Sequence, residues 1–351
     1  MRPLPPEWFT QNRVDTVLIR TSEAIQDPLL TGFTNLYPTD FTFFFIQSPQ
    51  RKHFICGHME KGAVKKNYRG PLTVIQKKSD WVRALKPFMR GKRVGINLPY
   101  LTAAQLANLK KEFPRTRFTD VSGALEETRK IKEKDEQKKL MEGARITQEV
   151  LHGMHHVVKT GMKEIELAAE IDHQFHKNGC TNSFSTIVAF GKNSRNIHHY
   201  NSSAKLRKGD VILMDAGARY QGYCADLSRT FVFGNATSEQ EKWYALCHRA
   251  LQEGMRAIFP GEKGKKAFAI AEKTLGKKIP HALGHGIGLE THDVPSGIGP
   301  SAEWAFEKDM CLAVEPGYYG KTFGIRIEEN GMVTREGFKP WSKAPKRLVV
   351  W

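Results

Sequence analysis

Asp215 and Asp226 stand in the stretch DVILMDAGARYQGYCADLSRTF, residues 210–231. β-rich runs flank Gln221-Gly222, a dipeptide that favours a hairpin turn. In an antiparallel pair, Asp215 and Asp226 are predicted to lie nearly opposite each other on one face, with Cβ atoms about 4.5–5.5 Å apart. Carboxylates that close repel unless a proton or metal ion intervenes. Because Asp215 directly follows the apolar run VILM, where an unpaired charge is costly, the pair predicts a metal site.

Three later stretches carry further metal-ligating side chains. They are HALGHGIGLETHD (281–293), AVEPGYYG (313–320) and GIRIEENGMVT (324–334). Glycines flank His285 and let the backbone approach a site closely, and Glu315 ends an apolar run before a sharp turn. Each signal alone is weak, because a Gly-rich turn or a surface glutamate would explain it.

The stretch 324–334 is predicted to be a single strand. Alternation places Ile325 and Ile327 on one face and Arg326 and Glu328 on the other. A single glutamate in such a strand is more often a surface residue. Four acids and a histidine in similar contexts, however, are hard to explain as solvated surface, so the sequence predicts a hydrolytic metal centre.

The motifs DAGA and DLSRTF, GHGIGLETHD, VEPG and GIRIE, in that order, closely resemble the pita-bread metallopeptidase family. Within it they are most similar to the Xaa-Pro peptidases, prolidase and aminopeptidase P. The resemblance covers about 130–345, and residues 1–125 resemble the creatinase-type N-terminal domain more loosely. It implies a pita-bread catalytic domain behind a smaller α/β domain.

The resemblance implies a dinuclear site, with one ligand set carried over position by position. The implied ligands are Asp215, Asp226, His285, Glu315 and Glu328. Glu328 is preferred over Glu329 because the family's ligand is the glutamate of its Arg-Ile-Glu run. Ligation rich in oxygen with one imidazole suits Mn²⁺ and would accept Co²⁺, Fe²⁺ or Zn²⁺.

Further roles follow from the same resemblance. His292 matches a histidine beside the scissile carbonyl, His281 matches one typical of the Xaa-Pro branch, and Arg326 matches the arginine that supports the acid cluster. His199 matches the family's histidine before tyrosine, although the adjacent His198 competes, since neighbours on a strand point to opposite faces.

The implied reaction is attack of a metal-activated water on the peptide carbonyl. Glu315 would shuttle the proton, and Arg326 would support the acids. His199 and His292 would stabilise the oxyanion and bind substrate together with His281. Histidines at 152, 155, 156, 173 and 176 have helical spacing that could bind metal by accident, but a solvated face explains them better.

The elements that position these residues form two predicted domains, 1–125 and 126–351. The first mixes apolar runs at 42–47, 72–76 and 93–97 with helices, including one over 80–90. The second is predicted to contain helices over 126–160, 163–178 and 238–276, mostly strands between 184 and 233, and short strands with Gly/Pro turns from 280. The fold class is therefore α/β (α+β).

Composition limits the function further. The net charge is +17, of which residues 1–125 contribute +11 and residues 126–351 contribute +6. No nucleic-acid motif accompanies this charge, so nucleic-acid binding is not expected. Five scattered cysteines and the lack of a secretory signal or an apolar run of spanning length indicate a cytoplasmic protein without a membrane span.

Several functions stay open at this point. The preferred one is an Xaa-Pro dipeptidase that acts on small peptides with proline at the second position, in a homodimer. An aminopeptidase P that cleaves longer Xaa-Pro peptides is the main alternative. A non-catalytic pita-bread binding protein, or a creatinase-like hydrolase, is disfavoured because the metal ligand set is complete.

Overall fold

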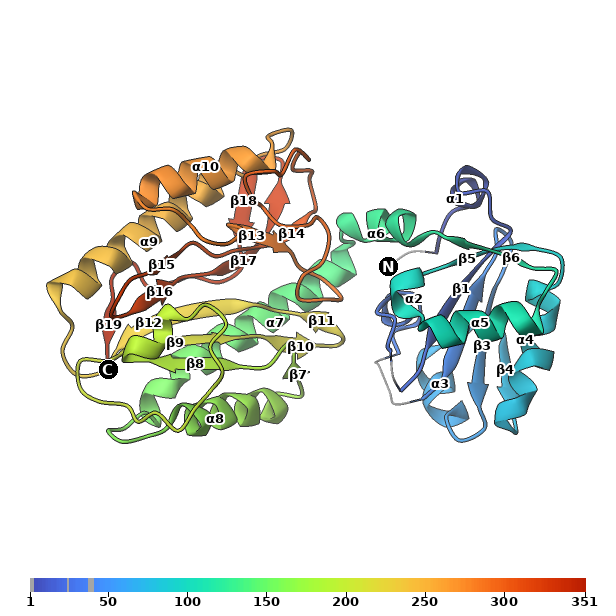
Figure 1. Ribbon diagram of the computed structural model, residues 1–351, viewed down its shortest axis with the longest axis horizontal. Helices are drawn as coiled ribbons and strands as arrows, with labels where there is room; N and C mark the ends of the chain where they lie inside the picture. The colour runs from blue at the N-terminus through green and yellow to red at the C-terminus, as the bar shows by residue number, and fades with distance from the viewer. Residues whose placement is uncertain (1–2, 24, 37–40) are drawn as a thin grey trace. The chain divides into compact units, whose positions relative to one another are not determined.

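The structure, a computed structural model, describes residues 3–23, 25–36 and 41–351. The chain divides into two compact units, Met1–Arg129 (unit 1) and Lys130–Trp351 (unit 2), which we describe separately (Figure 1). The boundary predicted between residues 125 and 126 falls inside helix α6 (Ser122–Lys130).

Unit 1 is built on one sheet with the strand order β4-β3-β2-β1-β5-β6. The strands are β1 (Thr16–Thr21), β2 (Phe43–Gln47), β3 (Lys52–Gly57), β4 (Leu72–Ile75), β5 (Arg93–Ile96) and β6 (Arg117–Asp120). Its helices, besides α6, are α1 (Pro6–Gln11), α2 (Leu29–Thr34), α3 (Lys61–Asn67), α4 (Trp81–Met89) and α5 (Ala103–Glu112), with 3₁₀ turns η1 (Lys78–Asp80) and η2 (Leu98–Tyr100). Strand β2 is antiparallel to both neighbours, and the other strands run parallel.

Side-chain alternation along the strands gives this sheet two apolar faces. Val17 and Ile19 of β1 pack into one core with α1, α2, α3 and α6. Leu18 belongs to a second core, to which α4 and α5 contribute Leu85 and Leu109. Helices therefore cover both faces, as expected when strands are buried on both sides.

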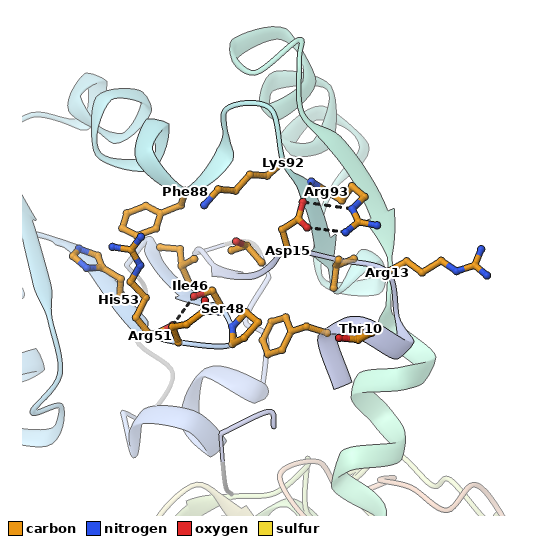
Figure 2. A pocket seen from close by; sticks show the side chains of 15 residues that line it. Thr10, Arg13, Asp15, Ile46, Ser48, Arg51, His53, Phe88, Lys92 and Arg93 are labelled. Carbon is orange, nitrogen blue, oxygen red and sulfur yellow. Dashed lines mark hydrogen bonds and ion pairs between the residues drawn. The ribbon is translucent and has the colours of Figure 1, made fainter. Parts of the chain in front are cut away.

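Part of the excess positive charge of unit 1 surrounds a cavity of about 470 Å³ near the start of β1 and β5 (Figure 2). Arg13 and Arg51, which are exposed, and Lys92 line it. Asp15 also lines it, but its carboxylate accepts from the Arg93 side chain at 2.8 Å and from the Arg93 backbone N–H at 2.8 Å. The carboxylate in this basic cavity is therefore already paired.

Unit 2 contains four long helices and several small sheets. The helices are α7 (Lys134–Gly153), α8 (Glu164–Lys177), α9 (Ser238–Arg256) and α10 (Gly264–Leu275), with 3₁₀ turns η3 (Met154–His156) and η4 (Gly191–Arg195). The strands are β7 (Thr181–Asn182), β8 (Ile187–Phe190), β9 (Val211–Ala216), β10 (Ala218–Tyr220), β11 (Tyr223–Cys224), β12 (Leu227–Val232), β13 (Gly284–Gly286), β14 (Cys311–Val314), β15 (Gly317–Tyr319), β16 (Gly324–Arg326), β17 (Glu329–Thr334), β18 (Gly337–Pro340) and β19 (Val349–Val350).

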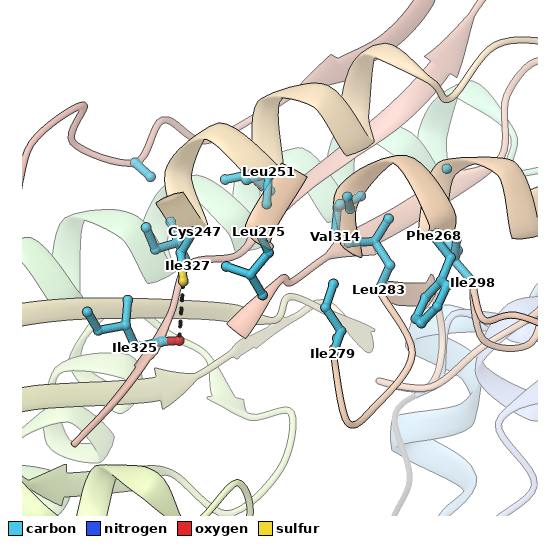
Figure 3. Packing of buried hydrophobic residues seen from close by; sticks show 14 of the residues in the cluster. Cys247, Leu251, Phe268, Leu275, Ile279, Leu283, Ile298, Val314, Ile325 and Ile327 are labelled. Carbon is cyan, nitrogen blue, oxygen red and sulfur yellow. Dashed lines mark hydrogen bonds between the residues drawn. The ribbon is translucent and has the colours of Figure 1, made fainter. Parts of the chain in front are cut away.

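These elements form two halves that repeat the same plan. In the first half, the sheet β19-β12-β9-β8 packs against α7 and α8. In the second, the sheet β13-β14-β17-β18 packs against α9 and α10, whose core is drawn in Figure 3. The residue before α8, Lys163, bridges Lys205, and the residue before α10, Lys263, bridges Ala305 in the same way. The sequence alone did not reveal this repeat.

Two predicted elements of unit 2 are divided in the structure. The helix predicted over 238–276 is two helices, because Pro260 and Gly261 interrupt it between α9 and α10. The strand predicted over 324–334 is divided between β16 and β17 at Ile327 and Glu328. The predicted faces nevertheless hold, since Ile325 and Ile327 are fully buried in the apolar core.

The five cysteines are free and buried, so the described structure contains no disulfide. Among the residues that the structure describes, no helix is long and apolar enough to cross a membrane.

Candidate metal centre

The β9–β12 hairpin holds both aspartates, in a register that corrects the predicted one. Gln221 and Gly222 form a two-residue turn with positive φ values of 47° and 82°, as a type I′ turn requires. This turn pairs Asp215 with Ser228 instead of Asp226. Asp226 lies two residues before Ser228, so it shares the face of Asp215 as a diagonal neighbour. The predicted shared face is retained, but direct opposition is wrong.

The second half has the directly opposed carboxylates. Val314 pairs with Glu329, and Gly317 pairs with Arg326. Continued across the gap between these pairs, the register places Glu315 opposite Glu328. His285, on the neighbouring strand β13, pairs with Ala313.

These side chains meet in one cluster drawn from both halves. Three groups of potential ligand atoms, each within 4.8 Å of one another, occur among the described residues. They are Asp226, His285 and His292; His285, Glu315 and Glu328; and Asp215, Asp226 and Glu328. All five predicted ligands belong to this cluster, whereas the helix histidines of the second predicted domain do not.

His285 is oriented as a metal-ligating histidine would be. Its Nδ1 lies 3.0 Å from the Gly286 carbonyl oxygen, which makes Nδ1 the donor. Burial lowers the pKa of His285, so the imidazole is neutral near pH 7 and Nε2 carries a lone pair. That Nε2 faces carboxylate oxygens, 3.5 Å from Asp226 Oδ2 and 3.7 Å from Glu315 Oε1. A lone pair aimed at carboxylates needs a cation between them.

The carboxylates of the cluster also lack enough positive charge around them. Burial first, and then the charges of the neighbouring acids, raise the pKa of both Asp226 and Glu328 far above the ordinary value. Two oxygens of the cluster, Asp215 Oδ1 and Glu328 Oε1, are buried without a hydrogen-bond partner among the described residues. Unpaired buried acceptors are rare in folded proteins, and divalent cations would satisfy them, so the donor set fits a metal centre.

Arg326 is the buried cation of the cluster. Its guanidinium donates to Asp215 Oδ2 at 2.6 Å and to the Ser228 hydroxyl at 2.7 Å. It also donates to the Ile197 carbonyl oxygen at 3.2 Å and to the Tyr319 hydroxyl oxygen at 3.0 Å. These four contacts fix Asp215 and connect it to the loop that precedes His198.

Glu328 and Glu329 have separate surroundings. The Glu328 carboxylate accepts from the Ser228 hydroxyl at 3.0 Å and faces the cluster. The Glu329 carboxylate instead accepts from the Ser342 hydroxyl and the Ala344 backbone N–H, and lies 3.4 Å from an Arg229 nitrogen. Glu329 therefore already has its partners on the other side of the strand.

Asn330 is a site residue that the sequence did not reveal. Its side-chain oxygen accepts from the Asp226 backbone N–H at 2.9 Å, and its amide donates to the Asp226 carbonyl oxygen at 2.7 Å. This clamp joins the two halves next to a predicted ligand. The one signal in the sequence was an asparagine directly after the Glu328-Glu329 pair.

His281 lies in a hydrogen-bonded chain with Tyr319, which sequence reasoning also missed. His281 Nδ1 is 2.7 Å from the Ala282 carbonyl oxygen, so the neutral ring accepts at Nε2 from the Tyr319 hydroxyl at 3.0 Å. Tyr319 in turn accepts from Arg326. Burial raises the pKa of Tyr319 to about 12, so the hydroxyl keeps its proton near pH 7.

The tandem histidines differ from the prediction, which placed His199 in the site. His199 Nε2 is 2.8 Å from Glu164 Oε2, and the His199 side chain is only 10% exposed. His198 is exposed, and its charge adds to burial in lowering the pKa of both His281 and His292. Because consecutive side chains diverge, binding Glu164 directs His199 away from the cluster and leaves His198 beside it.

His292 lies over His285, with ring centroids 4.3 Å apart and the rings nearly perpendicular. Lys132 holds the loop that carries His292. Buried Lys132 donates to the Val294 carbonyl oxygen at 2.8 Å and lies 3.9 Å from Asp293 Oδ2. Nothing in the sequence paired Lys132 with this loop, because 161 residues separate Lys132 from Asp293.

Comparisons with known proteins agree with this geometry. The sequence profile of metallopeptidase family M24 matches residues 138–335, and that of the creatinase/prolidase N-terminal domain matches residues 7–131. Xaa-Pro dipeptidase from Lactobacillus helveticus is 33% identical over 71% of this chain and 70% of its own length. The uncharacterized peptidase YqhT from Bacillus subtilis (strain 168) is 32% identical over 97% of both chains.

A solved structure supports the same fold. The prolidase from Pyrococcus horikoshii OT3 superposes with a TM-score of 0.88 at 26% identity, covering 98% of each chain. The M24 profile spans more than half of the present chain. This chain is therefore a pita-bread peptidase that belongs to metallopeptidase family M24.

Proposed function

We propose that this peptidase is a dinuclear, metal-dependent Xaa-Pro dipeptidase. The observation that carries the proposal is the cluster in which two unpartnered carboxylate oxygens and the Nε2 of a neutral histidine converge. Its proposed metal ligands are Asp215, Asp226, His285, Glu315 and Glu328. Four carboxylates and one imidazole favour Mn²⁺, with Co²⁺, Fe²⁺ or Zn²⁺ as alternatives.

When bound, the metal ions would supply a more acidic water and polarise the scissile carbonyl. Glu315, whose Oε1 faces His285, is the proposed carrier of the proton between the attacking water and the leaving proline nitrogen. His292 is an exposed member of the cluster, and the exposed His198 is near enough to lower the pKa of His292, so each is proposed to donate to the developing oxyanion.

Arg326 has a positioning role in this proposal. It fixes Asp215 directly and is coupled to His281 through Tyr319. His281, with Nδ1 bound to its own backbone, holds one defined tautomer and is proposed to contact the substrate. Substrate binding would then rest on His198, His281 and His292.

Dipeptides are the preferred substrates because the relatives named Xaa-Pro dipeptidase match this chain at about 30% identity. The alternative is an aminopeptidase that cleaves longer Xaa-Pro peptides, since both kinds of enzyme share this fold. A non-catalytic binding protein is disfavoured because such a protein has no reason to gather four carboxylates, two of them buried, around one neutral histidine.

The direct test compares Ala-Pro with Ala-Pro-Ala as substrates of the purified Mn²⁺-loaded chain. A dipeptidase releases proline from Ala-Pro and leaves Ala-Pro-Ala intact, whereas an aminopeptidase releases alanine from the tripeptide. An Asp226→Asn chain, prepared identically, controls for contaminating peptidases. Metal-loaded protein that cleaves neither peptide would overturn the proposal.

We further propose a homodimer that works in the cytoplasm. All five thiols are free and buried, which agrees with a reducing compartment. Sedimentation equilibrium of the metal-loaded chain tests the oligomeric state, because a 39.8 kDa chain and its dimer differ twofold in mass. A monomer across the micromolar range would contradict this assignment.

A further inference from the structure

A second cavity of unit 1, of about 280 Å³, lies between the sheet and helices α4 and α5. Its walls are mainly apolar, with Phe44, Ile55, Ile75, Trp81 and Leu109 among them. The opening includes exposed Ala104 and Asn108 on α5. The cavity is enclosed by one unit alone and belongs to no part of the metal centre.

The cavity lies at the end of the sheet where ligands bind in open α/β folds. Arg20 is near the carboxyl end of β1, and Ile75 is the last residue of β4. Strands β1, β3 and β4 run parallel, so their carboxyl ends share this edge. Crevices outside the carboxyl ends of parallel strands are the usual binding sites of such sheets.

One row across the sheet forms the floor of the cavity. Arg20 pairs with Phe44, and Phe44 pairs with Ile55, so the three side chains stand side by side on one face. The Arg20 guanidinium lies 5.7 Å from the centre of the Phe44 ring. Trp81 stacks on Phe44 with centroids 6.0 Å apart and an interplanar angle of 16°. The floor and wall therefore combine a cation with two aromatic rings.

Arg20 is a half-buried cation whose contact with the Phe44 ring leaves part of its guanidinium without a partner. Its NH1 nitrogen is buried without a hydrogen-bond partner, and no acid among the described residues forms an ion pair with Arg20. Burial lowers the pKa of its guanidinium, which reflects the cost of a cation in apolar surroundings. Buried donors are normally paired, because an unpaired one loses its hydration without compensation.

Helix α5 adds a second positive element at the opening. It begins at Ala103, and its Gln105 N–H and Leu106 N–H are capped by Thr102. Ala104, in the first turn of α5, lines the cavity. The first N–H groups of a helix and its dipole favour a negatively charged group nearby.

The basic cavity near Asp15 (Figure 2) makes a useful contrast. There Arg93 is already paired, and Arg13 and Arg51 are exposed to water, so hydration satisfies their charge without a ligand. Arg20 has no partner acid among residues 3–23, 25–36 and 41–351, and its guanidinium is only partly hydrated. The apolar cavity is therefore the better candidate for a ligand site.

We propose that this cavity binds a small carboxylate with an apolar, preferably aromatic, body. The carboxylate would accept from the Arg20 guanidinium, and the body would fill the space between Ile75 and Trp81. Such a ligand matches both halves of the cavity, since it neutralises the unpaired cation and buries apolar surface. This site is separate from peptide cleavage and stands without the proposed function.

The test uses 3-phenylpropionate and its neutral analogue 3-phenylpropionamide, titrated into the full-length metal-loaded chain by calorimetry. A hydrogen-bonded charge pair strengthens binding by about 1.5–3 kcal/mol, so the acid is expected to bind about tenfold or more tightly than the amide. Arg20→Met removes the cation and keeps the stem. It should erase this preference while leaving amide binding within about threefold.

Two further variants separate the cavity from other effects. Arg83→Met, on α4, removes an arginine whose side chain is 84% exposed, and it should leave both affinities unchanged. Ala104→Leu fills the opening from an exposed helical position, and it should weaken the acid and the amide together. A preference for the acid over the amide that persists in Arg20→Met would place the carboxylate at another site, such as the metal centre, and would overturn the proposal. An absence of saturable binding in the unmodified chain would overturn it as well.

Discussion

The two halves of unit 2 share a backbone plan but carry different side chains at equivalent positions. Asp215 and Glu315 occupy the same place, one on β9 and the other directly after β14. Ser228 pairs with Asp215 on the first sheet, and Glu328 takes the corresponding place opposite Glu315. The first position keeps an acid in both halves, whereas the second exchanges a hydroxyl for a carboxylate.

The remaining equivalent positions differ more. Thr230 binds the backbone of Arg326 through its hydroxyl, and Asn330 binds the backbone of Asp226 through its amide. These reciprocal contacts make Asp226 the counterpart of Arg326. The register likewise makes Ala189 the counterpart of His285.

The cluster therefore arises from different side chains at equivalent positions of the two halves. A duplicated scaffold provides paired positions around one axis, and substitutions within the pairs create the cluster. Only the position shared by Asp215 and Glu315 remains alike. The cluster holds four carboxylates against one arginine and one neutral histidine, and this imbalance is what calls for divalent cations.

Removing one carboxylate from each half should lower activity more than any other substitution considered below. Asp226→Asn and Glu328→Gln should each lower kcat/KM by about three orders of magnitude or more, because residues that act as a unit lose most of the activity singly. Both variants should stay folded without metal, since burial already favours the uncharged acid. Steady-state kinetics and metal stoichiometry measure the effect.

Glu329→Gln is the matched control for Glu328→Gln. It removes the adjacent carboxylate, which is held by Ser342, Ala344 and Arg229 instead of facing the cluster. It should cost about 3–5 kcal/mol of unfolding free energy, because it breaks a buried ion pair, but retain metal. Equal loss of metal from both variants would undo the distinction between Glu328 and Glu329.

The tandem histidines lie on a loop of the first half, between β8 and β9. His198→Asn should lower kcat about 10²–10³-fold, the usual effect of losing an oxyanion donor, with no change in thermal midpoint. His199→Asn should instead lower the unfolding free energy by about 1–3 kcal/mol, because Glu164 loses a buried partner. A reversed pattern in kinetics and thermal melts would return His199 to the active site.

Ser228→Ala tests the pair formed with Glu328 at a smaller scale. The hydroxyl donates to Glu328 and accepts from Arg326, so its loss should weaken metal binding about 10–100-fold. Ser342→Ala removes another buried hydroxyl, which binds Glu329, and it should leave metal affinity unchanged. Competition with a fluorescent chelator measures both, and equal weakening would show only a general effect of buried hydroxyls.

Much of the fold could be predicted from the sequence. Apolar runs and helix-forming stretches marked β2, β4, β5 and α4 in unit 1 and the helical regions of unit 2, where the stretch 238–276 proved to be two helices. Local patterns also indicated the shared face of Asp215 and Asp226. The predicted register was wrong because it placed the centre of the hairpin midway between the two aspartates. The Gln221-Gly222 turn sets that centre and so fixes the register.

The parts of the site that could not be predicted depend on long-range contacts. Asn330 reaches Asp226 across 104 positions, and Tyr319 reaches His281 across 38. Choosing between His198 and His199 needed Glu164, which lies 35 residues from His199. No local pattern contains these pairs, because tertiary packing decides them.

Glu164 gives the smallest effect and the last test of the two halves. It is the first residue of α8, and its counterpart at the start of α10 is Gly264, so only the first half has this carboxylate. Its oxygens accept from Phe190, Asn193, His199 and twice from Ser202. These bonds fix the loop that presents His198.

The pH dependence of this carboxylate follows from its environment. Burial raises the pKa of Glu164, but the hydrogen bonds that it accepts outweigh burial and leave the pKa below its ordinary value. A lowered folded-state pKa means that the stabilisation is complete above the unfolded pKa of about 4.3 and is lost as the pH falls through the folded-state pKa.

Glu164→Gln should therefore lower the unfolding free energy by about 1–3 kcal/mol at pH 7, because an amide donates where the carboxylate only accepts. The gap between the unmodified chain and Glu164→Gln should narrow below about pH 4, where the glutamate gains a proton. Glu170→Gln, on the same helix, should change stability little. Urea unfolding of the metal-free chains at both pH values measures this gap. If this difference in unfolding free energy does not change with pH, the shape of the Glu164 side chain, and not its charge, fixes the loop. Its counterpart Gly264 has no side chain that could do the same.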